Sequence, residues 1–535
     1  METETKEHAA GGGYVRSLTL VATLGGLLFG YDTAVISGAV KSLQNFFIDS
    51  LYSDPARALH VIWQYQITII VVIYLIGVAV GAVLIKLYGR KNGAIGTVIL
   101  LFIAAVFLYY FLNRGQALNE KTANSLKGFT ISSALIGCIL GGAIGGFISR
   151  TAGRKNGLII AAILFTLSGV GSALPDRLNF FFTENIISFI IYRIIGGVGV
   201  GLASMLSPMY IAEIAPPESR GKLVSWNQFA IIFGMLIVYF VNYFISLQGN
   251  DSWLTQTGWR WMLGSESIPA IVFLILLAFV PETPRFLVMR NRDDQALGLL
   301  HKLGLGEKAD HVLSEIRDSL WVKDAPWLSY GGTLILIGIL LSVFQQFVGI
   351  NVVLYYAPEI FRNMGSKTDT SLLQTIIVGA VNLSFTIVAI FTVDRFGRKP
   401  LQMIGALGMA VSMAGLGITF FSEHVGILTL VFMLAYTAFF AVSWGPVTWV
   451  LLSEIFPNKI RGAMSIAVAA QWIANLAISW TFPMMNDNTW LNGIFHHGFA
   501  YWIYGVMGLA AAIFVWKLVP ETKGKTLEEM EKIWT

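Results

Sequence analysis

The chain consists mainly of long apolar segments separated by short polar loops. Each apolar segment is about 20 residues long or longer, which is the length a helix needs to cross the hydrocarbon core of a bilayer. The segments lack the two-residue alternation of membrane-spanning β-strands. They lie at about 17–40, 64–87, 94–112, 128–149, 157–174, 186–207, 223–246, 261–280, 329–356, 371–393, 401–421, 426–452, 463–485 and 498–519. We therefore predict an all-α membrane protein with about 14 spans.

Composition agrees with this prediction and excludes several other classes of protein. Hydrophobic residues make up 55% of the chain and charged residues only 13%, against roughly 25% charged residues in a soluble protein. Cys138 is the only cysteine, so an intrachain disulfide and a thiolate metal site are excluded. We expect no metal and no cofactor. The net charge of +5 is spread over short loops, so nucleic-acid binding is not expected, and no cleavable signal peptide is apparent.

The distribution of Lys and Arg predicts the orientation in the membrane. If the N-terminus is cytoplasmic, 26 of the 36 Lys and Arg residues fall in cytoplasmic segments and nine in outer loops, among them Lys127. Arg193 remains inside a span. This positive-inside bias predicts that both termini are cytoplasmic.

Three motifs recur along the chain. The pair Glu213 and Arg220 recurs as Glu454 and Arg461, and the other two repeats pair 150–155 with 394–399 and 281–283 with 520–522. The offsets are 241, 244 and 239 residues, which indicates two homologous halves in tandem, as in transporters. The predicted parts are an N-terminal half (1–285), a cytoplasmic helical linker (286–328), a C-terminal half (329–520) and a cytoplasmic tail (521–535).

A second, shorter repeat lies within the first half. The stretches 75–77 and 89–93 have the same sequences, in the same order, as 135–137 and 153–157. We interpret residues of about 44–113 as an inserted helical hairpin that arose by partial duplication. The alternative is a chance likeness between glycine-rich apolar loops.

Charged residues of the repeats gather on the predicted cytoplasmic side. Salt bridges there can hold one state of a transporter whose halves rock, and break in the other state. The candidate latch residues are Arg150, Arg154, Glu213, Arg220, Asp394, Arg398, Glu454 and Arg461.

Three charged residues lie within apolar segments. Asp32, Arg193 and Glu266 are each surrounded by apolar sequence, where an unpaired charge is costly, so we expect them to pair or to face water. Burial and a nearby arginine have opposite effects on the proton affinity of a carboxyl group, so such a site can change protonation near neutral pH. The alternative is a permanent structural ion pair.

An uncharged polar cluster lies in the segment 344–358. Gln345, Gln346 and Asn351 bring three amides into an apolar run, and amides both donate and accept hydrogen bonds without carrying charge. This suits a neutral, hydroxyl-rich ligand such as a sugar, although amides also join membrane helices to one another. We expect a helix bend at Gly349 and a helix end at Pro358.

Taken together, these motifs resemble the sugar porter family of the major facilitator superfamily, most of all its bacterial D-xylose:proton symporters. The resemblance covers nearly the whole chain outside 44–113, and the family has twelve spans. The motifs that carry it are 25–38, 192–201, 281–285, 344–358, 394–399, 444–449 and 520–525. It implies the major facilitator fold of two six-helix halves, here with an extra hairpin.

The resemblance also implies roles for particular residues. Asp32 matches the proton-binding carboxylate, with Arg193 as its charge partner and Glu266 as a modulator. Met235 departs from the pattern, since the xylose symporters have a glutamine there. The implied sugar-binding residues, including gate residues and apolar walls, are Gln228, Gln345, Gln346, Asn351, Trp449, Gln471, Trp472, Asn382, Tyr355, Phe29 and Phe440.

The function predicted from these observations is proton-coupled import of a monosaccharide, D-xylose, by alternating access. The resemblance implies a multi-pass protein of the bacterial inner membrane, and we expect a monomer whose partners are the sugar, the proton and the bilayer. One alternative is a facilitative uniporter in which Asp32 is only structural. Another is a non-transporting sugar receptor, although the 15 residues after Pro520 are few for a signalling tail. An enzyme is not expected.

Overall fold

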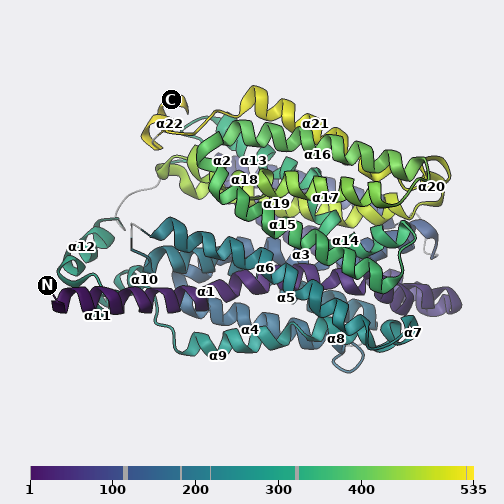
Figure 1. Cartoon of the computed structure of the whole chain (residues 1–535), viewed down its shortest axis with the longest axis horizontal. Coiled ribbons are helices and arrows are strands. Elements are labelled where there is room, and N and C mark those ends of the chain that lie inside the picture. The colour runs from purple at the N-terminus through teal and green to yellow at the C-terminus, as the bar shows by residue number, and fades with distance from the viewer. Residues whose placement is uncertain are drawn as a thin grey trace.

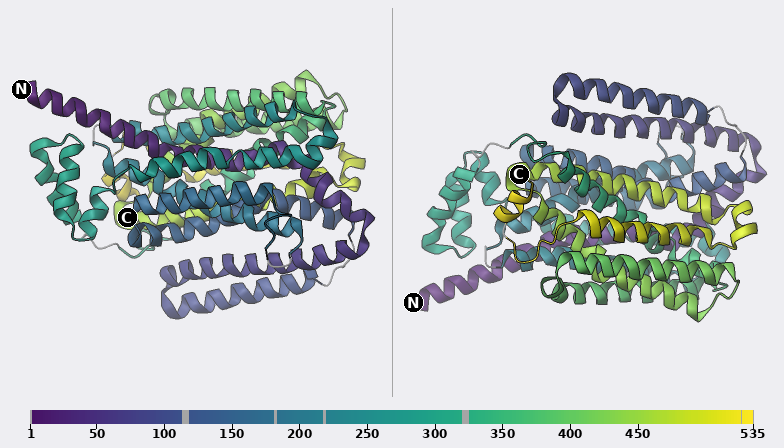
Figure 2. Two further views of the ribbon diagram at one scale, coloured as in Figure 1. Left: turned by 90° about the horizontal axis from the view of Figure 1, so that it is seen from below. Right: turned by 90° about the horizontal axis from the view of Figure 1, so that it is seen from above.

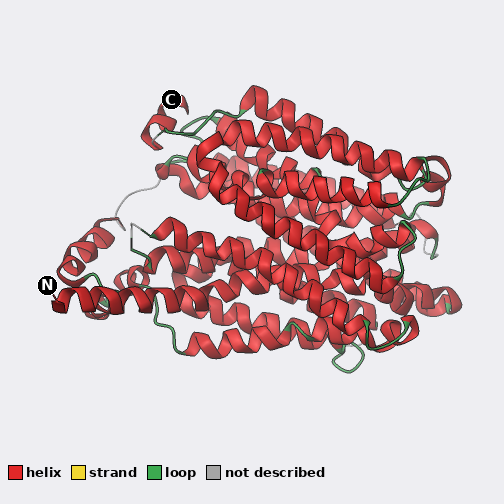
Figure 3. Ribbon diagram, in the orientation of Figure 1, coloured by secondary structure: helices red, strands yellow, loops and turns green. Residues whose placement is uncertain are grey.

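The computed structural model describes residues 2–112, 118–180, 183–216, 219–319, 325–525 and 527–534. A few side chains within these ranges, including those of Asp394 and Arg461, are not described. Every regular element in the described part of the chain is a helix (Figure 3). Thirteen helices there are long and apolar enough to cross a membrane, and 91–102 forms a further, shorter apolar helix. The all-α membrane fold and the estimate of about 14 spans are confirmed.

The N-terminal half is built from long helices that alternate in direction. Glycines let these helices approach closely, as is usual in membrane bundles: a Cβ added at Gly30 would lie 1.8 Å from the carbonyl oxygen of Ile231 on the neighbouring helix. The principal helices of this half are α1 (Glu2–Leu43), α2 (Pro55–Leu112), α3 (Glu120–Thr151), α4 (Arg154–Ala173), α5 (Asn185–Ile214), α6 (Arg220–Ser246), α7 (Asp251–Trp253), α8 (Trp259–Gly264) and α9 (Ser267–Ala278).

The predicted inserted hairpin corresponds to α2. Its helix turns back at Gly89, whose φ of 80° and ψ of 166° are not helical. The two arms lie side by side along the outside of the bundle in both views of Figure 2. Tyr65 bonds to Ser125 of α3 at 2.9 Å, and the ammonium group of Lys86 lies 4.0 Å from the centre of the Trp327 ring.

The C-terminal half repeats the pattern of the first. A short helical linker formed by α10 (Pro284–Met289), α11 (Asp293–Lys302) and α12 (Ala309–Ser319) precedes it. Its helices are α13 (Gly332–Phe347), α14 (Ile350–Asn363), α15 (Thr368–Phe396), α16 (Arg398–Phe421), α17 (Ile427–Val442), α18 (Trp444–Ile455), α19 (Met464–Asn486), α20 (Thr489–Phe495), α21 (Phe499–Leu518) and α22 (Leu527–Trp534).

The break between α13 and α14 occurs where the sequence predicted a bend. Gly349 adopts the left-handed conformation with φ of 93°, which favours glycine because it has no Cβ. The expected helix end at Pro358 is wrong, since α14 continues past Pro358 to Asn363. Proline is tolerated inside membrane helices where neighbouring groups satisfy the backbone carbonyl it frees.

The two halves pack along their lengths. Contacts between them are most extensive where α3 meets α19 and where α6 meets α15. The N-terminus of α1 and the C-terminus of α22 lie at the same end of the molecule, whereas α7 and α20 lie at the opposite end (Figure 1). We call these the terminal end and the distal end.

Candidate functional site: a buried charge centre and an amide cluster

The three charged residues predicted to pair do come together. Asp32 lies on α1 and Arg193 on α5, and Glu266 immediately precedes α9. Arg193 donates from Nη1 to Asp32 Oδ1 at 2.7 Å and from Nη2 to the backbone oxygen of Asp32 at 2.9 Å. Its Nη1 is 4.0 Å from Glu266 Oε2. All three side chains are at most 1% exposed, so this charge centre is shielded from solvent in the present state.

The charge centre is unbalanced, because one guanidinium faces two carboxyl groups. Asp32 Oδ2, Arg193 Nε and Glu266 Oε1 are buried without a hydrogen-bond partner in the described part of the chain. Leaving buried polar atoms unpaired is costly, and two carboxylates beside a single cation would leave one uncompensated negative charge. A proton on one carboxyl group removes that charge, so the arrangement can bind a proton reversibly.

The three amides predicted to bind sugar form one chain of hydrogen bonds. Asn351 donates to Gln346 Oε1, and Gln346 donates to Gln345 Oε1 at 3.4 Å. Gln345 in turn donates to the backbone oxygen of Trp444 at 2.8 Å. Gln345 and Gln346 come from the end of α13 and Asn351 from the start of α14. The helix break at Gly349 is therefore what turns these side chains toward one another.

The aromatic residues of the predicted sugar site come from both halves. The ring of Phe29 on α1 lies 5.7 Å from that of Trp472 on α19, so the two halves meet there. Asn475, one turn after Trp472, donates to the Tyr355 hydroxyl at 3.5 Å. The sequence analysis did not single out Asn475, although its position one turn after a predicted sugar residue was a usable signal.

The structure shows fewer contacts for the other predicted sugar-binding residues. Phe440 is buried beside Gly445, whose backbone oxygen accepts from Gln345. Trp449 on α18 is 37% exposed. The remaining three are Gln228 on α6, Asn382 on α15 and Gln471 on α19. No hydrogen bond joins Gln228, Asn382, Trp449 or Gln471 to the amide chain in the described part of the structure. Their roles stay predictions. Met235, the departure from the family pattern, is buried on α6.

Four of the eight candidate latch residues lie in two matching clusters at the terminal end, one in each half. In the first, Arg154 binds Glu213 at 2.8 Å and Thr283 donates to Glu213 at 2.7 Å. In the second, Arg398 binds Glu454 at 2.8 Å, and Thr522 donates to Glu454. Each cluster therefore ties together helices of its own half.

Four members of the candidate latch lie outside these two pairs. Arg150 and Arg220 are exposed, and within the described residues neither forms an ion pair. The side chains of Asp394 and Arg461 lie outside the described residues. A latch role for all eight residues stays a prediction.

A second glutamate in each cluster caps the start of a helix. Glu282 accepts the backbone N–H of Arg154 at 3.1 Å, and Glu521 accepts those of Arg398 at 3.1 Å and Lys399 at 3.0 Å. Burial raises the pKa of Glu282 above its ordinary value although backbone N–H groups oppose it. Burial also acts to raise the pKa of Glu521, but four backbone N–H donors outweigh it and hold that pKa below its ordinary value.

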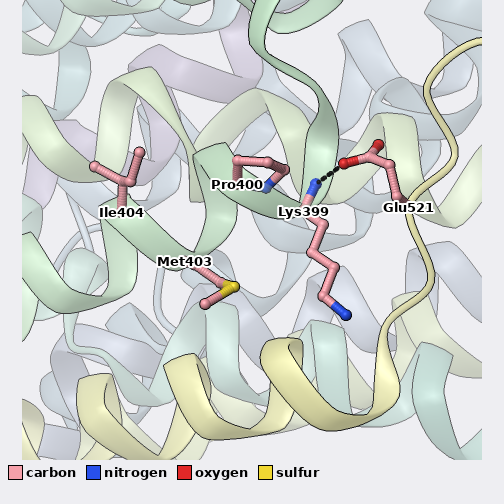
Figure 4. A pocket seen from close by; sticks show the side chains of 5 residues that line it. All are labelled: Lys399, Pro400, Met403, Ile404 and Glu521. Atoms are coloured by element: carbon pink, nitrogen blue, oxygen red, sulfur yellow. Dashed lines mark hydrogen bonds between the residues drawn. The ribbon is translucent and has the colours of Figure 1, made fainter.

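Figure 4 shows the bond from Lys399 to Glu521 beside an open pocket of about 440 Å³. The lining residues are Lys399, Pro400, Met403, Ile404 and Glu521. None of them belongs to the predicted sugar site, so this pocket is separate from the amide chain.

Comparison with known proteins identifies the family. The profile described as "Sugar (and other) transporter" matches residues 18–120 and again 107–534. Together the two matches cover nearly all of the chain. The chain belongs to the sugar transporter family. The two matches of this family profile overlap at 107–120, which includes the last turn of the hairpin α2.

Curated members of the sugar transporter family match along almost their whole length. The D-xylose-proton symporter of Escherichia coli (strain K12) is 53% identical, with 97% of this chain and 96% of the relative covered. The glucose facilitated diffusion protein of Zymomonas mobilis is 38% identical, with 98% of each covered. The arabinose-proton symporter of Bacillus subtilis is 35% identical, with 99% of this chain and 97% of the relative covered. These relatives are transporters and not enzymes.

Solved structures of the family share the fold. The inward open conformation of the xylose transporter XylE from E. coli superposes with a TM-score of 0.77 at 51% identity, covering 98% of this chain and 100% of that one. The same transporter bound to 6-bromo-6-deoxy-D-glucose gives a TM-score of 0.71 at 53% identity. The two-halved major facilitator fold is therefore confirmed.

Proposed function

We propose that this protein is a proton-coupled importer of D-xylose that works by alternating access in the bacterial inner membrane. The observation that carries the proposal is the charge centre, in which Arg193 binds Asp32 while Glu266 lies close by without a full partner. The similarity to a D-xylose-proton symporter along the whole chain supports the choice of sugar and of coupling ion.

The charge centre suggests how a proton is coupled to movement. With Asp32 ionised, its bonds to Arg193 tie α1 to α5 in the core of the N-terminal half. Protonation of Asp32 weakens the charge-assisted bond and frees Arg193 to turn toward Glu266. Movement of the guanidinium group from one carboxyl group to the other gives the N-terminal half two discrete arrangements. Proton binding then selects between these arrangements.

We assign sugar binding to the amide chain and to the predicted aromatic residues. Gln345, Gln346 and Asn351 supply donors and acceptors for hydroxyl groups, and Trp472 offers an apolar face to the C–H groups of a sugar ring. Because Phe29 of the first half contacts Trp472 of the second, a ligand placed here touches both halves. Closure of the halves around the sugar then follows from its contacts with each.

The positive-inside bias of the sequence supports a cytoplasmic location for the terminal end. The sugar would then enter from the distal end. We expect a monomer, because one chain supplies both halves and all residues of the charge centre and the amide chain.

The main alternative is a facilitative uniporter, since a glucose facilitated diffusion protein is also similar. The partly unpaired atoms of the charge centre favour coupling, because a purely structural ion pair has no need of a second, unbalanced carboxyl group.

The test uses Asp32→Asn in proteoliposomes with an imposed proton gradient. We expect the variant to exchange labelled D-xylose across the membrane but to lose accumulation against a concentration gradient, because an amide cannot take up the coupling proton. Asp49→Asn is the matched control, since Asp49 is exposed at the end of the same first span. Undiminished accumulation by Asp32→Asn would refute the coupling role.

A further inference from the structure

A second buried charge cluster lies at the distal end and shares no residue with the charge centre. Lys127 on α3 donates to Glu359 Oε1 on α14, and to Asp487 Oδ2 just after α19 at 2.7 Å. The Lys127 side chain is only 4% exposed, and those of Glu359 and Asp487 are 10% and 23% exposed. The sequence-based placement of Lys127 in an outer loop is therefore wrong, because it lies two turns inside a helix.

This cluster joins the two halves of the transporter. Lys127 belongs to the N-terminal half, whereas both of its carboxylate partners belong to the C-terminal half. Around it, Glu120 accepts the backbone N–H of Thr489 at 2.6 Å, and Asn124 donates to the backbone oxygen of Asp487 at 3.1 Å. The α3–α19 interface is thus tied by several polar bonds at the distal end.

The terminal end is arranged differently. There Arg154 and Arg398 each bind a glutamate of their own half, so those ion pairs do not hold the halves together. In the part of the chain that the structure describes, ion pairs join the halves at the distal end but not at the terminal end. This difference agrees with the similarity to the inward open conformation of XylE. Among the described residues, the ion pairs that cross between the two halves are those of Lys127 with Glu359 and Asp487.

We propose that Lys127, Glu359 and Asp487 form an ionic clamp that holds the distal end of the transporter closed. The clamp rests on the alternating-access part of the proposed function. When the halves close at this end, an ammonium group is removed from water but gains two carboxylate partners. When they separate, all three groups become hydrated again. The clamp therefore sets the balance between the closed and open states of the distal end.

The charges of the clamp determine in which direction it shifts the equilibrium between the closed and open distal end. If Lys127 is replaced by an apolar residue, closure buries Glu359 and Asp487 beside each other without the ammonium group that binds both, which is strongly unfavourable. The closed state loses this stabilisation, whereas the open state, in which both carboxylates contact water, is little changed. Removing the lysine should shift the equilibrium toward an open distal end.

Distances between spin labels measure this equilibrium directly. In a Cys138→Ser background, labelled cysteines replace the exposed residues Lys121 and Trp490 at the distal end. A second pair replaces Lys222 and Lys523 at the terminal end, where both residues are exposed. Distance distributions from pulsed electron resonance in nanodiscs then report how far each end is open, with no sugar or proton gradient present.

For Lys127→Met we expect the ratio of open to closed distal ends to rise at least tenfold. A tenfold rise corresponds to about 1.4 kcal/mol in favour of the open state. The label pair at the terminal end should move closer together at the same time. Lys127→Arg keeps the charge and should behave like the parent protein. Lys41→Met is the matched control, since Lys41 is an exposed lysine near the distal end of α1.

Two further variants test the clamp by changing the charges of its carboxyl groups. Neutralising the whole cluster with Lys127→Met, Glu359→Gln and Asp487→Asn should restore much of the closure, because none of the three positions then buries a charge. If Lys127→Met does not yield folded protein, Glu359→Gln with Asp487→Asn leaves the lysine alone and should also open the distal end. Distance distributions identical to the parent protein in the folded variants would overturn the clamp. Because no transport is measured, this failure is distinct from a failure of proton symport.

Discussion

Replacing Gly349 by alanine tests whether the break between α13 and α14 builds the sugar site. Gly349 has φ of 93°, and a side chain in the left-handed region costs about 1–2 kcal/mol. The added Cβ would lie 2.8 Å from two ring atoms of Tyr504. Tyr504 is itself only 1% exposed, so its ring has little room to move. Overpacking of this kind costs about 1–3 kcal/mol, for a total of about 2–5 kcal/mol.

Gly365 provides the matched control for this substitution. Its φ of 88° imposes the same backbone cost, but an added Cβ would meet nothing within 4 Å. Gly365→Ala should therefore lose only about 1–2 kcal/mol. The difference between the two variants isolates the contact with Tyr504, and it corresponds to roughly a 5- to 150-fold change in the folded-to-unfolded ratio.

Reversible unfolding of the purified proteins in mixed micelles measures the stability of both variants. Binding of D-xylose, measured by calorimetry, should weaken in Gly349→Ala and stay unchanged in Gly365→Ala, because only Gly349 positions Gln346 and Asn351. Tyr504→Leu should recover part of the stability that Gly349→Ala loses. Equal stability and equal sugar affinity in the two alanine variants would refute the reasoning.

Two further predictions concern the helix cap at the terminal end and the aromatic contact between the halves. Glu521→Gln should lower the stability of the folded protein by about 1 kcal/mol, because four backbone N–H groups lose a carboxylate acceptor at a partly exposed site. Glu282→Gln should lower it less, because burial already penalises that charge; unfolding in mixed micelles compares the two. Since the folded-state pKa of Glu521 lies below its ordinary value, the stabilisation is complete above about pH 4.3. It is lost as the pH falls through the folded-state pKa, so wild type and Glu521→Gln should converge in stability on acidification, and a constant difference would contradict this. Trp472→Leu should weaken D-xylose binding by about threefold to tenfold, the equivalent of one aromatic contact, whereas Trp472→Phe keeps a ring and should weaken it less in the same calorimetric assay.

Much of the fold follows from local rules that the sequence displays. Long apolar runs predicted the spans, and the recurrence of Glu213 and Arg220 as Glu454 and Arg461 predicted two halves. The pairing of Asp32 with Arg193 was predictable as well, because a charge inside a span must find a partner. The bend at Gly349 followed from glycine in the middle of an apolar run flanked by amides.

Other features depend on contacts between residues far apart in the chain. Lys127 stands at the boundary of an apolar run, after polar residues, so the sequence alone placed it in a loop. Its burial depends on Glu359 and Asp487, which lie more than 200 residues away. Similarly, the candidate latch residues were expected to act as one group, whereas the structure divides their ion pairs between the two halves.

The central claim is that sugar and proton move together, and it is tested most directly by sugar-driven proton flux. Proteoliposomes containing the purified protein and an internal pH indicator receive D-xylose or D-glucose outside, with no imposed proton gradient. The account predicts that D-xylose acidifies the interior and that Asp32→Asn abolishes the acidification. Entry of labelled D-xylose without any change of internal pH would contradict the account and make this protein a uniporter.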